Sequence, residues 1–164
     1  MAKASVYLET TIISYLTSRP SRDLVVSAHQ QITHDWWDKV RRRFEIMVSE
    51  AVMEEIRSGD PDAAARRIEV ARQFRVLELT EDVGKLAQIY QRELGVPSRA
   101  KTDVVHIAFA VAYAADYLMT WNCSHIANGE VIRRLIDLNT EMGRFTPLIV
   151  TPEELLEYSP EEEI

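Results

Sequence analysis

The feature that most constrains the fold is the alternation of short apolar runs with longer segments of helical periodicity. Five short runs predict β-strands, at residues 6–8, 44–48, 76–79, 117–120 and 148–150. Apolar residues between these runs recur at helical spacing and predict helices at about 10–18, 22–43, 50–58, 62–74, 80–94, 104–115 and 129–142. Strands that alternate with helices in this way predict an α/β fold with a parallel sheet.

Residues with short polar side chains stand where several of these helices are expected to start. Their oxygens cap free backbone N–H groups, and the predicted N-caps are Thr10 or Thr11, Ser49, Thr80 and Thr102. Gly59-Asp60-Pro61 predicts the end of one helix and the start of the next. The helix at 104–115 is apolar nearly all round, which predicts that it is buried.

Length and composition narrow the class of protein. The chain's 164 residues fit one domain, which we assign to residues 1–158, followed by an acidic tail at 159–164 that is expected to be disordered. Cys123 is the single cysteine, so no intramolecular disulfide can form, and we expect a cytoplasmic protein. No apolar stretch approaches the roughly 20 residues of a membrane span, so no membrane partner is expected.

The charge pattern bears on nucleic-acid binding. A formal net charge of −7 repels phosphates at long range and argues against such binding. That argument weakens if the acids gather and bind divalent cations, which reverse the local sign. Two basic clusters, Lys39 with Arg41–Arg43 and Arg66 with Arg67 and Arg72, are each interpreted on their own as solvated helix faces.

Four oxygen-bearing side chains are expected at one edge of the sheet. Glu9 directly follows the strand at 6–8, and Asn122 follows the strand at 117–120. Asp103 opens the buried helix, and Glu55 lies on the helix after the second strand. Ligands of parallel sheets bind beyond the carboxyl ends of the strands, and Mg²⁺ and Mn²⁺ favour carboxylate and amide oxygens. The four side chains therefore predict a divalent-metal site.

Each of these residues also has a purely structural interpretation. Glu9 and Asp103 can complement helix dipoles, Glu55 can be a surface acid, and Asn122 is a common turn residue. Taken singly, the structural interpretation is favoured, and the metal site depends on their joint placement. His106 lies three residues after Asp103 and so on the same side of the helix. It is expected to be a core residue, or to support the metal ligands from behind, rather than to be a ligand itself. A Cys123–His125 dyad lacks a third partner in the sequence.

Four segments together form a recognisable series of motifs: Val6-Tyr7-Leu8-Glu9-Thr10-Thr11, Val48 to Ile56, Lys101 to Ala108, and Asp116 to Asn122. They resemble the motifs of the PIN-domain family, in the family's order and over nearly the whole chain. The resemblance is greatest to VapC-type toxins and related bacterial PIN proteins. In the family, these motifs are an acid after the first strand, a Ser-capped helix with a glutamate, an aspartate that opens a buried helix, and a strand that ends in Thr, any residue, then Asp or Asn.

This resemblance implies both a fold and an activity. PIN domains have a central parallel sheet with helices on both faces, a three-layer sandwich. Their acids hold one or two Mg²⁺ or Mn²⁺ ions that hydrolyse RNA phosphodiester bonds. VapC toxins are usually homodimers, neutralised by a small antitoxin protein that covers the active site. The resemblance thus predicts a metal-dependent endoribonuclease, the toxin of a type II toxin–antitoxin pair.

The predicted mechanism is metal-assisted hydrolysis. Asp103 and Glu9 are expected to be direct ligands, Glu55 a ligand or base, and Asn122 a holder of metal-bound water. Thr10 is expected to position Glu9 or a phosphate. The remaining candidates for groups behind the ligands are Glu54, His106 and Thr120.

Two departures from the family pattern motivate an alternative. Glu9 is one methylene longer than the usual first aspartate, and Asn122 replaces a frequent aspartate, so the site has one charge fewer. The second acid is ambiguous between Glu54 and Glu55, and the offset from Ser49 favours Glu55. The alternative is a PIN-like scaffold that binds protein or RNA without cutting it. A phospho-acceptor domain is disfavoured because the first strand lacks paired aspartates.

Overall fold

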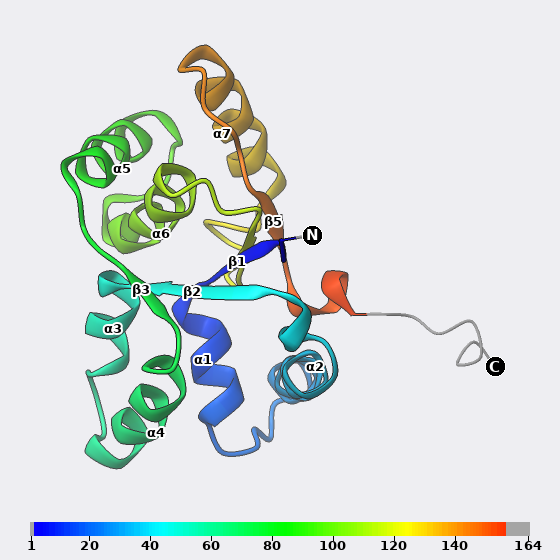
Figure 1. Cartoon of the computed structure of the whole chain (residues 1–164). Coiled ribbons are helices and arrows are strands. Elements are labelled where there is room, and N and C mark those ends of the chain that lie inside the picture. Colours follow the sequence, from blue (N-terminus) through cyan, green and yellow to red (C-terminus); the bar gives the residue numbers. More distant parts are fainter. Residues whose placement is uncertain (1, 157–164) are drawn as a thin grey trace.

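The fold is a five-stranded parallel sheet enclosed between two layers of helices (Figure 1). A computed structural model describes residues 2–156. Its strands are β1 (Ser5–Leu8), β2 (Glu45–Ser49), β3 (Arg75–Leu77), β4 (Tyr117–Met119) and β5 (Leu148–Val150). They are arranged in the order β3-β2-β1-β4-β5, and every neighbouring pair is parallel. The predicted tail at 159–164 lies outside the described residues.

Helices cover both faces of the sheet, as predicted. They are α1 (Thr10–Thr17), α2 (Leu24–Lys39), α3 (Glu50–Ile56), α4 (Pro61–Ala71), α5 (Glu81–Glu93), α6 (Lys101–Ala112) and α7 (Gly129–Glu141). Figure 1 shows α1 to α4 on one face and α5 to α7 on the other. Three 3₁₀ turns complete the order: η1 (Arg41–Arg43), η2 (Ser98–Ala100) and η3 (Pro152–Leu155). The predicted α/β three-layer architecture is therefore confirmed.

Local capping chemistry explains most helix starts. Ser49 and Thr80 cap α3 and α5 through hydrogen bonds to the backbone N–H of Val52 and Val83, as predicted. Asp60 caps α4, and Pro61 takes its first position, where its missing N–H costs nothing.

Two predicted caps are wrong. Glu9, and neither Thr10 nor Thr11, caps α1 by accepting a hydrogen bond from the Thr11 N–H. Thr102 lies inside α6, because η2 leads directly into that helix and Ala100 stands at its N-cap position.

Burial follows the predicted pattern in α6 and departs from it in α2. Seven residues of α6 are buried, in keeping with its all-round apolar sequence. In α2, Trp36 is buried as the periodicity predicts, but Leu24 is 86% and Val25 63% exposed. The buried residues of α2 all come from its later turns, so its first turn extends beyond the core. None of the helices within residues 2–156 has both the length and the hydrophobicity that a membrane span requires.

The strand order places a crevice at one edge of the sheet. β1 lies in the centre, and the chain builds β2 and β3 on one side of it before β4 and β5 on the other. This reversal of strand order is the point at which parallel sheets bind ligands, beyond the carboxyl ends of the strands. Glu9, Ser49 and Thr120 all lie at that edge, because they end or directly follow β1, β2 and β4.

Candidate active site

Glu9 anchors the site at the carboxyl end of β1. Its backbone N–H donates to the carbonyl of Met119 in β4, which ties it to the neighbouring strand (3.0 Å). Its side chain is buried, and Oε2 accepts hydrogen bonds from the hydroxyls of Thr11 (2.5 Å) and Thr120 (2.7 Å) as well as from the Thr11 N–H. A buried carboxylate needs such donors, since burial otherwise disfavours its charge.

A buried chain of polar side chains links the sheet to Glu55. The Tyr7 hydroxyl lies 2.7 Å from Ser49 Oγ and 2.7 Å from His106 Nδ1. The other ring nitrogen of His106, Nε2, contacts Glu55 Oε1. A carboxylate can only accept, so Nε2 carries the hydrogen. When the ring is neutral, Nδ1 accepts a hydrogen bond from the Tyr7 hydroxyl, which in turn accepts one from the Ser49 hydroxyl. When the ring is protonated, Nδ1–H donates to the Tyr7 hydroxyl, which then donates to Ser49.

Three carboxylates act on His106. Burial on its own lowers the pKa of His106, which is 1% exposed. The hydrogen bond with Glu55 and the charges of Glu9, Glu55 and Asp103 outweigh burial and raise the pKa above its ordinary value of 6.5. Burial, together with the charges of Glu9 and Glu55, also raises the pKa of Tyr7 well above 10 despite its bond to Ser49. Three of the predicted acids therefore act on this buried imidazole through their charge, and Glu55 alone contacts it.

A second histidine holds Asp103. His125 Nδ1 lies 2.9 Å from Asp103 Oδ2, and both side chains are about a fifth to a quarter exposed, at 26% and 19%. Asn122 Oδ1 accepts from the backbone N–H of Ser124 (3.3 Å) and His125 (3.0 Å). Asn122 thus shapes the turn that carries His125. Its amide NH₂ makes no hydrogen bond with the described residues.

The donor set suits a hard divalent cation. Glu9, Glu55 and Asp103 each use one oxygen in the bonds above, and the other oxygen of each makes no hydrogen bond with the residues described. Carboxylate oxygens of this kind are the ligands that Mg²⁺ and Mn²⁺ prefer. In the arrangement shown, however, no three acidic, histidine or cysteine side chains of residues 2–156 stand close enough to share an ion.

The other candidates lie as follows. Glu54 is exposed, whereas its neighbour Glu55 contacts His106, so Glu55 is the glutamate that faces the site. Thr120 binds Glu9 directly. The hydroxyl of Thr10 is buried and has no hydrogen-bond partner among the described residues. Thr11 takes the contact with Glu9 that was expected of Thr10.

Sequence reasoning missed four residues of the site, namely Tyr7, Thr11, Ser49 as a side-chain partner, and His125. Tyr7 looks like an ordinary strand residue, and its neighbours in the network are 42 and 99 residues away. His125 was set aside because its partner in the sequence was sought at Cys123, which is exposed. Tyr7 could have been found from the sequence, because side chains alternate along a strand and Tyr7 therefore lies on the same face as Glu9.

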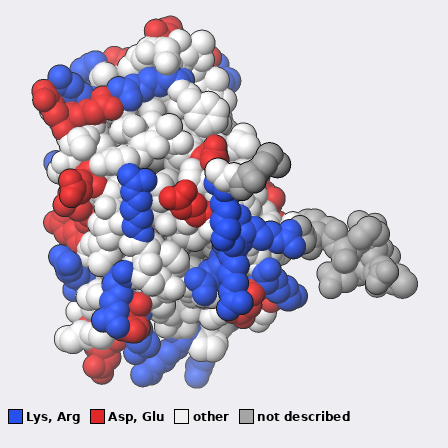
Figure 2. Space-filling model, in the orientation of Figure 1, with Lys and Arg blue, Asp and Glu red and all other residues white. Residues whose placement is uncertain are grey.

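The two basic clusters lie apart from each other. Arg41–Arg43 form η1, before the amino end of β2 and so at the opposite edge of the sheet from Glu9. Figure 2 shows Lys and Arg side chains gathered over this segment. Arg41 stacks on Trp37, and Lys3 donates to the carbonyl of Arg42. Arg66 and Arg67 line a hollow between α1 and α4, whereas Arg72 pairs with Glu69.

Comparison with known proteins identifies the fold. The sequence matches no protein-family model and has no match among curated proteins. Among solved structures, it is similar to Mycobacterium tuberculosis VapC20, described as a Sarcin-Ricin loop cleaving toxin, with TM-score 0.59 and 17% identity over 76% of this chain and 95% of that one. It is also similar to a chain of Rickettsia felis VapBC2 bound to a promoter DNA fragment, with TM-score 0.57 and 12% identity over 89% and 97%. The chain therefore has the PIN-domain fold of VapC-type toxins, as predicted.

Proposed function

We propose that this protein is a Mg²⁺- or Mn²⁺-dependent endoribonuclease and the toxin of a type II toxin–antitoxin pair, acting in the cytoplasm. The observations that carry the proposal are three carboxylates fixed by neighbouring side chains: Glu9 by Thr11 and Thr120 after β1, Glu55 by His106, and Asp103 by His125. Each of these carboxylates keeps one oxygen out of the hydrogen bonds that the described residues make. The VapC-type fold supports the same activity.

The chain's own residues hold these acids in place. A bound divalent ion supplies a low-pKa water and a Lewis acid for the phosphodiester. Thr11 and Thr120 fix Glu9 through Oε2, and His106 fixes Glu55 through its Nε2–H. His125 fixes Asp103. Outer partners of this kind set the orientation and basicity of metal-binding carboxylates. The amide of Asn122 is the group we assign to a bound water.

The test replaces Asp103 by asparagine and measures cleavage of an end-labelled RNA in Mn²⁺. Asp103→Asn keeps an acceptor for His125 but removes the charge that holds the ion. We expect cleavage to fall at least about a hundredfold, since loss of one charged active-site group costs about that much. Asp137→Asn, an exposed change on α7, is the matched control and should cut at the wild-type rate. Equal cleavage by Asp103→Asn and wild type would refute the assignment.

A second candidate is a scaffold of the same fold that binds a partner without cutting RNA. It is favoured by the absence, within residues 2–156, of a ready three-ligand cluster, and by the saturation of Glu9 Oε2 with three hydrogen bonds. Calorimetric titration of the metal-free protein with Mn²⁺ separates the two. Heat of binding that Asp103→Asn abolishes supports the nuclease, and no heat from a folded protein supports the scaffold.

The proposed toxin role also includes a homodimer and a small antitoxin partner. Light scattering on the purified protein measures the first. A short reading frame directly upstream of the gene, encoding a small protein that forms a complex with this chain, supports the second. If no such partner exists, the toxin role is lost and the nuclease proposal is untouched.

A further inference from the structure

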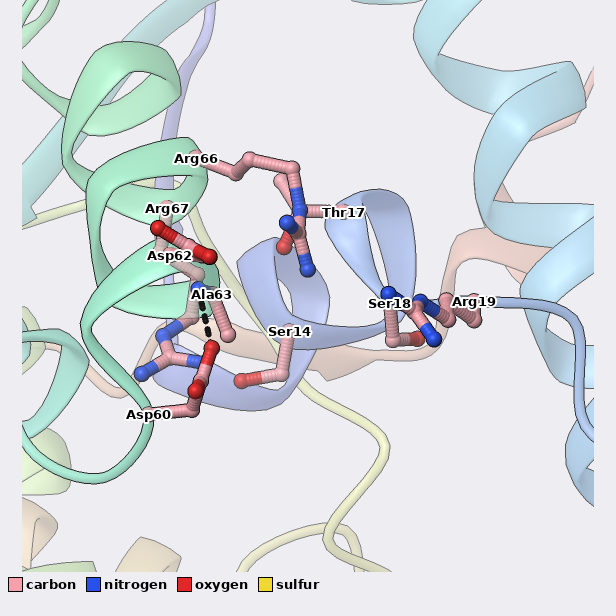
Figure 3. Close-up of a pocket in the computed structure, with 9 residues that line it drawn as sticks. All are labelled: Ser14, Thr17, Ser18, Arg19, Asp60, Asp62, Ala63, Arg66 and Arg67. Atoms are coloured by element: carbon pink, nitrogen blue, oxygen red, sulfur yellow. Dashed lines mark hydrogen bonds between the residues drawn. The ribbon is translucent and has the colours of Figure 1, made fainter.

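A polar hollow lies between the later turns of α1 and the start of α4. Its volume is about 490 Å³, within the range of about 300–1,000 Å³ usual for ligand pockets. Figure 3 shows the side chains that line it: Ser14, Thr17, Ser18, Arg19, Asp60, Asp62, Ala63, Arg66 and Arg67. None of them belongs to the site described above.

The hollow and the acid site lie along the same helix, α1. Thr10 follows Glu9, and Ser14 and Thr17 stand four and seven residues further, on the same face of the helix. At 1.5 Å per residue, Thr17 lies roughly 10 Å along the axis from Thr10. The hollow therefore lies about two helical turns from the start of α1, where Glu9 stands.

A second link joins the hollow to α3, which carries Glu55. Arg67 donates from Nε to the carbonyl of Ile56 (3.0 Å) and from Nη2 to that of Ser58 (2.6 Å). These bonds tie α4 to the end of α3. They also occupy the Arg67 guanidinium, so its role here is to hold the wall of the hollow.

Arg19 and Arg66 are the charges left to receive a ligand. Both are exposed, and neither guanidinium group has a hydrogen-bond or ion-pair partner among residues 2–156. In Figure 3, Arg66 extends from α4 across the hollow towards Thr17. Arginine has donors and no acceptor, so its partner must be an acceptor, best a phosphate or carboxylate.

The hydroxyls add donors of the same kind. Ser18 Oγ accepts a hydrogen bond from Gln30 (2.8 Å), so its own O–H is free to donate. Ser14 makes no side-chain hydrogen bond with the described residues. Two acids also line the hollow: Asp60 is occupied as the N-cap of α4 (2.9 Å), whereas Asp62 makes no hydrogen bond or ion pair with the described residues and offsets part of the positive charge. With three arginines against these two acids, the hollow keeps a net positive charge and free donors that suit an anion.

We propose that this hollow binds a backbone phosphate of the RNA strand, close to the bond that the acid site cuts. The inference rests on the proposed function for the identity of the strand. Arg66 and Arg19 pair with the phosphate, and Ser14 and Ser18 donate to its oxygens. The phosphate is preferred to an acidic peptide because α1 starts directly after Glu9, so the hollow lies about two helical turns from a carboxylate at which the RNA strand has to lie.

The test measures binding without cleavage. A short fluorescein-labelled single-stranded RNA is titrated with wild type, Arg66→Glu, Arg19→Glu and Arg72→Glu in EDTA, at several salt concentrations. We expect each of the first two changes to weaken binding about tenfold and to reduce the slope of log Kd against log salt by about 1. Arg72→Glu, the same charge change at the end of α4 outside the hollow, should match wild type.

Three results would overturn the proposal. These are wild-type protein that does not bind the RNA, Arg66→Glu that binds as tightly as Arg72→Glu, and an oligo-glutamate peptide that binds in an Arg66-dependent way when the RNA does not. The last would assign the hollow to an acidic protein. Arg66-dependent RNA binding without cleavage in Mn²⁺ would refute the proposed nuclease and leave the phosphate site standing.

Discussion

Two buried tyrosines, Tyr7 and Tyr90, take part in hydrogen-bond networks with different roles. Both are fully buried, and burial raises the pKa of both, to about 12 for Tyr90. Tyr90 donates to Asn139 Oδ1 (2.5 Å), and Asn139 Nδ2 donates in turn to Thr146 (2.9 Å). Tyr7 instead joins Ser49 and His106.

The two networks differ in where they end. The Tyr90 network consists of neutral groups, and it fastens α5 to α7 and to the loop before β5. The Tyr7 network ends at Glu55, a carboxylate whose side chain is 35% exposed. A closed neutral network satisfies buried polar groups and stabilises packing. An open network that reaches a charge at the surface can also orient that charge. We therefore expect the Tyr90 network to affect stability alone, and the Tyr7 network to affect both stability and activity.

The largest expected effect comes from opening the closed network. Asn139→Ala leaves the Tyr90 hydroxyl without an acceptor in the core and creates a small cavity. We expect the free energy of unfolding to fall by about 2–3 kcal/mol, measured by urea denaturation. Cleavage per folded molecule should stay at the wild-type rate. The control, Thr140→Ala on the exposed face of α7, should change stability by less than about 0.5 kcal/mol. Equal losses of unfolding free energy in Asn139→Ala and Thr140→Ala would contradict a stabilising role for the Tyr90 network.

A matched pair of substitutions tests the comparison directly. Tyr7→Phe and Tyr90→Phe each delete one buried hydroxyl, and each should cost about 1–2 kcal/mol of unfolding free energy. Tyr7→Phe alone should also lower kcat for RNA cleavage, by about tenfold, because Glu55 loses the support behind His106. The measurement is kcat at saturating RNA alongside urea denaturation. A parallel loss of kcat in Tyr90→Phe would show that activity follows stability alone.

The smallest expected effect is a pH dependence of stability. The pKa of His106 is raised in the folded state, so its charged form stabilises the fold. That contribution is complete below the ordinary value of 6.5 and is lost as pH rises through the folded pKa. In EDTA, the unfolding free energy of wild type minus that of His106→Gln should therefore be larger at about pH 6 than at about pH 9. A constant difference would contradict the raised pKa.

Local patterns were enough to predict most of the fold. The strands and helices follow from alternation and helical spacing, and the caps at Ser49 and Thr80 follow from their place before apolar segments. The capping error at Thr10 arose because Glu9, predicted as a ligand, also serves as the N-cap of α1. The exposure of Leu24 could not be predicted from local spacing, because it depends on tertiary packing. Only the later turns of α2 contact the core.

The site was predictable in its position and much less in its contacts. Placing Glu9 and Asn122 after strands located the edge of the sheet, because parallel strands end together. The pairing of His106 with Tyr7 depends on which face of α6 meets β1, and that is fixed by tertiary packing across 99 residues. The contact of His125 with Asp103 likewise depends on the Asn122 turn, which spacing alone does not specify.

The burial of most of α6 has a consequence for how the proposed metal site would respond to ions of different radius. Asp103 lies in the first turn of a helix of 12 residues, seven of which are buried and hold its backbone in place. Glu55 is carried by a helix of seven residues that ends shortly before Gly59, at a φ of +86°. If both acids bind the ion, we expect exchange of Mg²⁺ for the larger Mn²⁺ to displace the short helix α3 with Glu55 more than it displaces Asp103.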